Sequence, residues 1–410
     1  MPDPDTQFRA LVLTHVFPRS ADDSLGAFLL HLADALAACG IATDVLAPHE
    51  KKLRDEEMLG AARVQRFHYA PARLERLAYT GAMHELFARG LTNKILFGFF
   101  CIAFLFKTLS AIRALRPAIL HAHWWLPGGI VGALASMLTR VPLIVTTHGT
   151  DVEMLRRTCW ALPLARFVFR RARAITCGSN YLREQLLELR VADESRVSVV
   201  PMPVAAEFII HNSKFVSTNY DPSTTLRTGL RITNLILTVT RLTEQKDIAT
   251  LIRAFALLTE RTARLIIIGD GPTRAALEQL ARELNVGDRV EFLGALAQKE
   301  LPRYYAECAV FALPSLREGM GLVFAEALLC GAPVIAANSG GVTDIVQDGE
   351  TGLLVPERDA AALAVAIEKL LNDRALASRL AQNGAAFVRE RFSATRVAAQ
   401  FAQVYRNSVT

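Results

Sequence analysis

The sequence predicts an α/β protein made of two domains, each built around a parallel β-sheet. Short strands rich in Val, Ile and Leu alternate with helical patterns along the chain. Continuous apolar strands of this kind are typical of parallel sheets that are covered by helices on both faces. The alternation occurs in two separate series, and 410 residues exceed what one ordinary core accommodates. We therefore expect two Rossmann-like domains.

Each expected strand is a short apolar run bounded by turn residues. In the first series the strands are expected at 9–17, 41–48, 118–123, 142–149, 173–179 and 197–203. In the second series they are expected at 235–241, 264–271, 290–294, 310–315 and 333–339. Apolar residues with helical spacing at 27–39 and 273–284 predict two of the helices that separate these strands.

The junction between the two series has a different composition. Residues 206–233 are rich in Ser, Thr and Asn and show no strand or helix period over much of their length. We interpret them as an interdomain linker that carries an inserted surface loop around 213–231. The expected domains are then 1–205 and 234–388, followed by an amphipathic helical segment at 389–410.

Composition restricts the class of protein. With 51% hydrophobic and 21% charged residues, the chain is typical of a globular protein. Its six cysteines form no C-x-x-C pair, which argues against a disulfide framework or a cysteine zinc site and favours a reducing compartment. The amino-terminus is acidic and lacks the basic region of a signal peptide, so we expect a cytoplasmic protein.

The net charge of +6 falls entirely within residues 1–205. Nucleic-acid binding requires a denser basic face with exposed aromatic residues, so no nucleic-acid partner is expected. The same half holds the apolar run 95–106 between two lysines, and twelve residues are fewer than the about 20 that a membrane-spanning helix needs. A second apolar segment, 162–169, lies among six arginines, at 156, 157, 166, 170, 171 and 173. Core helices and peripheral contact with an anionic membrane both remain open interpretations.

Ligands of doubly wound sheets bind beyond the carboxyl ends of the strands, so we examine the residues that follow strands. Gly26 opens the helix after the first strand, where backbone N–H groups can approach an anion, although a plain turn glycine explains it equally. The motif HGTD begins at His148 and leaves a buried strand at its carboxyl end, which suits a site better than packing. His121 and His123 follow the preceding strand and are interpreted as structural histidines.

The second series carries cations and carboxylates in the same positions. Arg241 and Lys246 follow its first strand and can clamp a diphosphate, the alternative being ordinary surface charges.

The stretch EGMGLVFAE places Glu318 in a turn and Glu326 about one turn into a helix. The amides around Gly319 and Gly321, with Leu322 at the start of that helix, offer an anion cradle. Glu318 can accept hydrogen bonds from hydroxyls, and Glu326 can bind a ribose diol. Two carboxylates around a phosphate cradle suit a sugar nucleotide.

Taken together, these motifs resemble the retaining glycosyltransferases of family 4, which have the GT-B fold. The resemblance rests on the E-x7-E of Glu318 and Glu326, on RLTEQK, on IIIGDGP, on HGTD, on the Gly26 loop and on GAPVIAANSGGVTDIVQDGETGLLVP. It covers nearly the whole chain except the linker insertion. Thr240 and Asp247 stand where the family commonly has glycine.

The resemblance implies two Rossmann-like domains that face a central cleft, with the acceptor bound by the amino-terminal domain and the nucleotide sugar by the carboxy-terminal one. Arg241 and Lys246 would neutralise the diphosphate leaving group, Glu318 would contact the transferred sugar, Glu326 the ribose, and His148 would lie near the reaction centre. The last helix would cross back onto the first domain. Such enzymes use no metal at the leaving group, and we expect no cofactor beside the donor.

The expected function is transfer of a hexose from a nucleotide-diphosphate donor to an acceptor hydroxyl with retention of configuration. We expect a saccharide or lipid-linked acceptor, in cell-surface glycan or glycolipid assembly in the cytoplasm or at the inner face of the membrane. Two alternatives remain open: a sugar-nucleotide epimerase, and a catalytically silent nucleotide-sugar binding module, to which Thr240 and Asp247 would point. A phosphorylase would need a cofactor-bearing lysine, which no sequence feature indicates.

Overall fold

The structure, a computed structural model, describes residues 8–23, 25–79, 83, 90–205, 207–208 and 234–409. It divides into two compact units. Unit 1 consists of Met1–Pro203 together with Ala394–Thr410, and unit 2 of Val204–Ser393. The expected insertion at 213–231 lies outside the described residues.

The described part of unit 1 is built on an eight-stranded sheet in the order β3-β4-β2-β1-β5-β6-β7-β8. Its strands are β1 (Phe8–Leu13), β2 (Ile41–Pro48), β3 (Glu56–Leu59), β4 (Ala62–Phe67), β5 (Ile119–His123), β6 (Leu143–Thr147), β7 (Ala174–Cys177) and β8 (Val197–Val199). Every neighbouring pair is parallel except β3 with β4, a hairpin at one edge. The carboxyl ends of seven strands therefore meet along one edge of the sheet.

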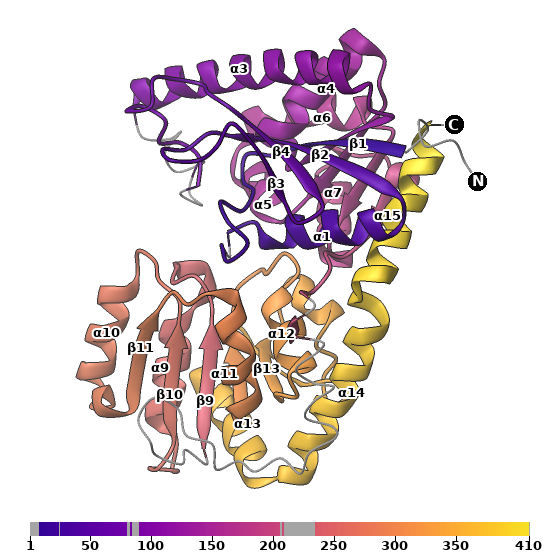
Figure 1. Cartoon of the computed structure of the whole chain (residues 1–410). Coiled ribbons are helices and arrows are strands. Elements are labelled where there is room, and N and C mark those ends of the chain that lie inside the picture. Colours follow the sequence, from indigo (N-terminus) through magenta and orange to yellow (C-terminus); the bar gives the residue numbers. More distant parts are fainter. Residues whose placement is uncertain are drawn as a thin grey trace. The chain divides into compact units, whose positions relative to one another are not determined.

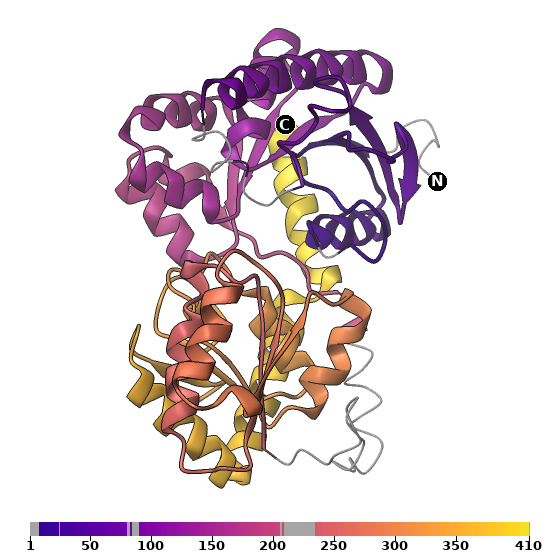
Figure 2. The same cartoon turned by 90° about the vertical axis from the view of Figure 1, so that its left-hand side faces the viewer.

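Helices connect these strands (Figure 1). They are α1 (Ala27–Ala38), α3 (Leu91–Leu115), α4 (Ile130–Thr139), α5 (Thr150–Arg157), α6 (Leu162–Arg171) and α7 (Asn180–Glu188). A further helix, α15 (Ala394–Val409), follows unit 2 in the sequence and completes unit 1. In both views the yellow α15 lies beside the indigo α1, and the two helices pack together (Figures 1 and 2). Tyr405 and Phe401 of α15 are fully buried in unit 1, and the Tyr405 hydroxyl lies 2.7 Å from Nδ1 of His121 on β5.

Unit 2 contains a six-stranded parallel sheet in the order β11-β10-β9-β12-β13-β14. The strands are β9 (Leu235–Val239), β10 (Arg264–Ile268), β11 (Val290–Gly294), β12 (Val310–Leu313), β13 (Val334–Ala337) and β14 (Leu353–Val355). The helices are α9 (Ile248–Leu257), α10 (Arg274–Glu283), α11 (Leu301–Glu307), α12 (Leu322–Leu329), α13 (Ala360–Asn372) and α14 (Arg374–Phe392). All residues of β9, β12 and β13 are buried, as expected for strands that helices cover on both faces.

The structure confirms the predicted fold class and all eleven expected strands, and it adds β3, β4 and β14. β4 escapes recognition because it carries Gln65 and Arg66, which are polar yet buried. The Arg66 guanidinium donates to the Tyr79 hydroxyl at 2.6 Å and the Pro18 carbonyl at 3.0 Å, and it pairs with Glu57 at 2.8 Å. A charged side chain that is fully paired in this way can occupy a buried strand position.

The apolar run 95–106 proves to be part of a much longer helix, which corrects the length estimate made from the run alone. The 25-residue helix α3 is long and apolar enough to cross a membrane, and one third of its most apolar 18-residue window is buried. Buried residues such as Phe100 and Phe104 occupy one face. The other face is apolar but exposed and carries Leu91, Ile95, Phe99, Ile102 and Phe106. One face of α3 therefore packs into the core of unit 1, and the opposite face is an exposed apolar surface.

Candidate active site

In unit 2, two loops bring Lys246 and Glu318 together. The loop after β9 ends in a 3₁₀ helix, Glu244–Lys246, which docks onto the loop after β12. Leu316 N–H donates to the Gln245 carbonyl at 2.8 Å, and the Gln245 amide donates to the Arg317 carbonyl at 3.2 Å. Lys246 Nζ then lies 2.5 Å from Glu318 Oε2. Two predicted donor-binding residues, 72 positions apart, thus form one ion pair.

The environment of Glu318 keeps it ionised. Its side chain is 14% exposed and that of Lys246 is 20% exposed. Burial alone would raise the pKa of Glu318, but the charge and hydrogen bond of Lys246 outweigh it and the pKa is lowered. The Ser315 hydroxyl and the Gly319 amide lower it further. Glu318 is therefore a carboxylate, able to accept hydrogen bonds from hydroxyl groups.

Gly340 fixes the backbone of Glu318, a role that sequence reasoning did not assign. The two residues form a parallel bridge, and Gly341 N–H donates to the Glu318 carbonyl at 2.7 Å. Gly340 has φ of 66°, and a Cβ there would lie 2.5 Å from the Glu318 carbonyl oxygen and 2.6 Å from its nitrogen. Only glycine satisfies both the conformation and the close approach. The consecutive glycines after the strand at 333–339 were the available signal.

The pKa of Glu326 is shifted in the opposite direction from that of Glu318. It lies on α12, is 9% exposed, and accepts a hydrogen bond from the buried Tyr305 hydroxyl at 3.1 Å. Burial raises the pKa of Glu326 to about 8. Near neutral pH one carboxyl group of the E-x7-E pair is thus ionised while the other mostly holds a proton.

The start of α12 resembles the predicted anion cradle. Gly321 precedes the helix with φ of 81°, and within the described residues no side chain caps this terminus. A Cβ on Gly321 would lie 3.0 Å from the Phe324 ring and 3.3 Å from Glu318 Cγ. Gly319 and Gly321 are buried, and Leu322 is partly exposed at the first helical position. Backbone amides thus begin beside the Glu318 side chain, although anion binding there stays a prediction.

The loop after β9 also carries Arg241, which is exposed. Thr240 N–H donates to the Ile268 carbonyl and Leu242 N–H to the Asp270 carbonyl, both at 2.9 Å. This loop therefore runs against the one after β10, where a Cβ on Gly269 would lie 1.8 Å from the Thr240 carbonyl oxygen. This close approach requires glycine at position 269, the first glycine of IIIGDGP.

Asp247 occupies its unusual position without disrupting the turn. It adopts the left-handed conformation, with φ of 47° and ψ of 40°, which explains why the family commonly has glycine there. Aspartate tolerates this region better than most residues. Its carboxylate also accepts a hydrogen bond from the Thr250 hydroxyl at 2.8 Å. The departure from the family pattern therefore leaves the turn intact.

In unit 1, Asp151 shapes the HGTD loop. Its carboxylate accepts backbone N–H groups from His148 at 3.0 Å, Gly149 at 3.1 Å, Val152 at 3.1 Å and Trp125 at 3.2 Å. Burial raises the pKa of Asp151 to about 6, although these amides oppose the effect. Asp151 thus holds the loop after β6 in place.

The half-buried ring of His148 ends a chain of histidines whose other members, His121 and His123, are buried. Its Nε2 lies 2.9 Å from Nδ1 of His123, and the ring packs against Trp124. His121 lies two residues before His123 on β5. Its Nδ1 lies 2.7 Å from the Tyr405 hydroxyl and its Nε2 lies 2.6 Å from the Thr146 hydroxyl, contacts that agree with a structural role. Within the described residues Nε2 of His123 has no hydrogen-bond partner.

Burial lowers the pKa of His148 to about 3, so the imidazole is neutral at working pH. Its placement near a reaction centre stays a prediction, and the ring carries packing and hydrogen bonds as well.

Gly26 opens α1 as predicted, with φ of 79°. A Cβ there would lie 2.8 Å from Cγ1 of Val16, so close packing against the loop after β1 already requires glycine. Anion binding at this position stays a prediction.

The chain matches two families of known proteins. Residues 230–387 match the family described as glycosyl transferases group 1, and residues 25–203 match the glycosyl transferase 4-like domain. D-inositol 3-phosphate glycosyltransferase from a Nocardioides species is 31% identical over 417 residues, covering 94% of this chain and 85% of that protein. GDP-mannose-dependent alpha-(1-6)-phosphatidylinositol monomannoside mannosyltransferase from Mycobacterium tuberculosis is 31% identical over 284 residues, covering 64% and 69%.

Solved structures agree in fold. Sucrose-phosphate synthase from Thermosynechococcus elongatus superposes with a TM-score of 0.78 at 26% identity, covering 97% of this chain and 98% of that one. HepE from Anabaena, solved in complex with UDP-glucose, gives a TM-score of 0.72 at 21% identity, covering 96% and 98%. The second likeness concerns the fold alone.

Proposed function

Because the chain belongs to the family 4 glycosyltransferases and has the GT-B fold, we propose that it moves a sugar from a nucleotide-diphosphate donor to an acceptor hydroxyl with retention of configuration. The observation that supports this most is the pair formed by Lys246 and Glu318 beside the start of α12, which no side chain of the described residues caps. A cation, a carboxylate and the backbone amides at a helix start, gathered at the ends of parallel strands, suit a ligand with both phosphates and hydroxyls.

Each group has a separate task in this proposal. Lys246 and Arg241 neutralise the diphosphate as the glycosidic bond breaks, which is where preorganised charge lowers the barrier most. Glu318 accepts hydrogen bonds from the transferred sugar, and Glu326 from the ribose. In the ligand-free state Glu318 partners Lys246, so the donor phosphates would take over part of that role. We propose that these cations act in place of a metal, and that no cofactor is needed beside the donor.

A donor panel tests the proposal. UDP-, GDP- and ADP-sugars are added to the protein, and the matching donor at about 100 times its dissociation constant should stabilise the fold by roughly 2.7 kcal/mol. We then expect slow donor hydrolysis that releases the sugar in the donor's own anomeric form, as followed by NMR. An epimerised donor would favour the epimerase, and binding without turnover would favour the silent module. No stabilisation by any donor would contradict the proposal.

We further propose that the acceptor is lipid-linked and reached at the cytoplasmic surface of a membrane. The exposed apolar face of α3 is the first support, because a helix that packs on one side and shows aromatic residues on the other suits an interface. α4 packs against both α3 and α6, and each contributes exposed apolar residues, among them Leu138 and Phe167. In the Mycobacterium tuberculosis relative the named acceptor is a phosphatidylinositol monomannoside, which agrees with this proposal.

Positive charge accompanies this apolar surface. Four arginines line one pocket beside α6, namely Arg166, Arg170, Arg190 and Arg196, with Asp193 as the acidic member. Arg166 also donates to the Arg190 carbonyl and Arg196 to the Arg170 carbonyl, each at 3.1 Å, and these bonds hold the pocket together. Arg171 is not part of the pocket lining, and its guanidinium donates to the Ser136 carbonyl at 2.9 Å. The pocket therefore suits a phosphate group, with Arg166 and Arg170 as the helix residues that would meet an anionic headgroup.

Vesicle co-sedimentation at low salt tests the membrane proposal. We expect binding to anionic vesicles but not to neutral ones. Removing two cations with Arg166→Gln and Arg170→Gln should cost about 2 kcal/mol, or roughly thirtyfold in binding. Phe99→Ser with Phe106→Ser should weaken binding as well. Val365→Ser is the matched control, since Val365 is 66% exposed in unit 2. Binding that none of these changes alters would leave a soluble saccharide as the acceptor.

A further inference from the structure

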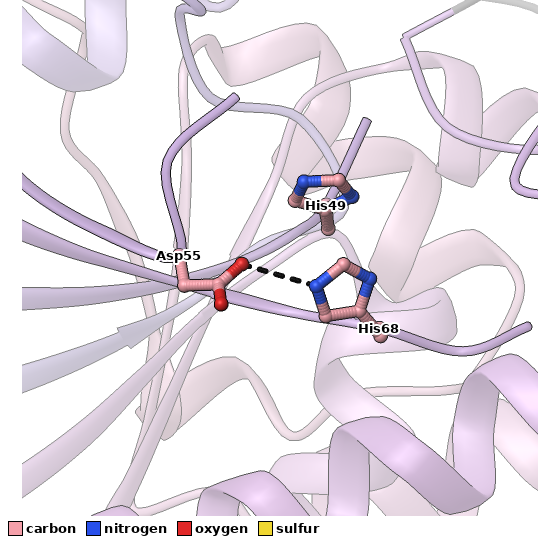
Figure 3. A group of neighbouring side chains, drawn as sticks. All are labelled: His49, Asp55 and His68. Carbon is pink, nitrogen blue, oxygen red and sulfur yellow. Dashed lines mark hydrogen bonds and ion pairs between the residues drawn. The ribbon is translucent and has the colours of Figure 1, made fainter. Parts of the chain in front are cut away.

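Two histidines stand side by side at an edge of the unit 1 sheet that the donor chemistry does not use. β2 and β4 are parallel neighbours whose last paired residues are Pro48 and Phe67, and each strand is followed by a histidine. His49 N–H donates to the Phe67 carbonyl at 2.9 Å, which fixes the two strand ends together. The rings of His49 and His68 are 3.9 Å apart between centroids, and the Asp55 carboxylate points at the His68 ring (Figure 3).

A single buried carboxylate orients both rings. Oε2 of Glu75 lies 2.8 Å from Nδ1 of His49, and Oε1 lies 3.1 Å from Nδ1 of His68. The Glu75 side chain is fully buried and also accepts the Tyr69 N–H at 3.2 Å. An ionised carboxylate can only accept, so both Nδ1 atoms carry hydrogen. In neutral rings both Nε2 atoms then present lone pairs.

Those two Nε2 atoms face further acceptors. Nε2 of His68 lies 3.0 Å from Asp55 Oδ1, and Nε2 of His49 lies 3.1 Å from the Leu53 carbonyl oxygen. A neutral imidazole has one N–H, which Glu75 already takes, so each remaining contact brings a lone pair against an oxygen. A bound cation resolves both conflicts at once.

We infer that His49 Nε2, His68 Nε2 and an Asp55 carboxylate oxygen form a binding site for a divalent transition metal of the zinc type. Two imidazoles and one carboxylate are a common ligand set for zinc. Donation of the other ring nitrogen to a carboxylate, as both rings do to Glu75, is the usual support for histidine ligands. The ligand atoms lie within 4.8 Å of one another. Ligand atoms that are each about 2.1 Å from one ion lie no more than roughly 4.2 Å from one another, so modest closure of the site is needed.

The exposure of the ligands makes that closure feasible. The Asp55 side chain is 71% exposed and that of His68 is 50% exposed, so both can move, whereas His49 and Glu75 are fixed in the interior. Arg66 N–H donates to the Asp55 carbonyl at 2.8 Å and keeps that residue beside β4. The metal would tie the segment that follows β2 to the one that follows β4. None of the residues proposed to hold the donor belongs to this site, so its role is to organise the loops of unit 1.

Metal titration tests this inference. The tag-free protein is stripped with chelator and titrated with ZnCl₂ by calorimetry, and with CoCl₂ by absorption spectroscopy. We expect one zinc per chain, a rise in the melting temperature, and a cobalt spectrum of tetrahedral type. Asp55→Asn and His68→Ala should each weaken binding at least tenfold, and Glu75→Gln by about 10- to 100-fold.

The matched control is Glu56→Gln, because Glu56 is an exposed carboxylate on the adjoining strand β3 that pairs with Arg63. Its affinity for zinc should equal that of the unaltered protein. Circular dichroism verifies that each variant is folded, and the exposed positions of Asp55 and His68 favour that outcome. The absence of saturable binding, or equal affinity in the Asp55 and His68 variants, would overturn the inference.

Discussion

Replacing Lys246 with alanine is expected to lower turnover on the order of 100-fold or more, because the charge that meets the leaving group is lost. The structure adds a second consequence. Lys246 Nζ lies 2.5 Å from Glu318, and without it that buried carboxylate has lost its charged partner. The pKa of Glu318 should then rise, since burial is no longer outweighed. Steady-state kinetics and thermal melts of the single variant measure both effects.

A double variant separates catalysis from folding. Combining Lys246→Ala with Glu318→Gln removes the stranded charge, so the melting temperature should recover toward that of the unaltered protein while turnover stays low. Lys246→Arg is a further comparison, because a planar guanidinium does not reproduce an ammonium point charge. Near-normal turnover in Lys246→Ala would refute the leaving-group assignment. Recovery of turnover in the double variant would show that the loss came from Glu318 instead.

Nucleotide affinity is expected to rise with pH up to about pH 8, with Glu326 as the cause. Burial raises the pKa of Glu326 to about 8, and ribose hydroxyls bind best to its ionised form. Below pH 8, binding must first remove a proton, so affinity should fall by up to about tenfold for each pH unit. Calorimetry of nucleoside diphosphate binding between pH 6 and 9 measures the slope. Glu326→Gln should bind more weakly and with a flatter profile. An unchanged slope in that variant would place the titrating group elsewhere.

The same carboxyl group should influence stability in the opposite direction. The folded protein retains the Glu326 proton up to a pKa of about 8, whereas the unfolded chain releases it near the ordinary value of 4.5. Its contribution to stability is therefore complete below about pH 4.5 and is lost as pH rises through 8. The difference in unfolding free energy between Glu326→Gln and the unaltered protein should therefore shift in favour of the variant as the pH rises from 6 to 9. Urea unfolding at those two values decides the sign.

The sequence predicted the architecture well because parallel strands buried on both faces leave a continuous apolar signal. β4 lacks that signal, since Arg66 is buried through pairing that only the fold can provide. β14 has three residues, too few for a period to be visible. The carboxy-terminal stretch was expected as one helical segment, but Ser393 adopts extended angles and separates α14 from α15.

The candidate site was predicted as a set of residues but not as an arrangement. Lys246 and Glu318 were each assigned to the donor, yet their mutual ion pair spans 72 positions and no local pattern encodes it. The same applies to Gly340, whose close approach to Glu318 is a tertiary contact. The histidines at 49 and 68 escaped attention because they become neighbours only through the register of β2 with β4.

The path of the chain through the two units has a consequence for synthesis. Unit 2 occupies Val204–Ser393 as one uninterrupted segment, while unit 1 is completed only by α15. Topologically, unit 2 is an insertion within unit 1. Chains emerging from the ribosome usually fold their amino-terminal domain first, but here Tyr405, which contacts His121, is synthesised only after the whole of unit 2. Unit 2 can therefore fold from one continuous segment, whereas the core of unit 1 stays incomplete until α15 has been synthesised.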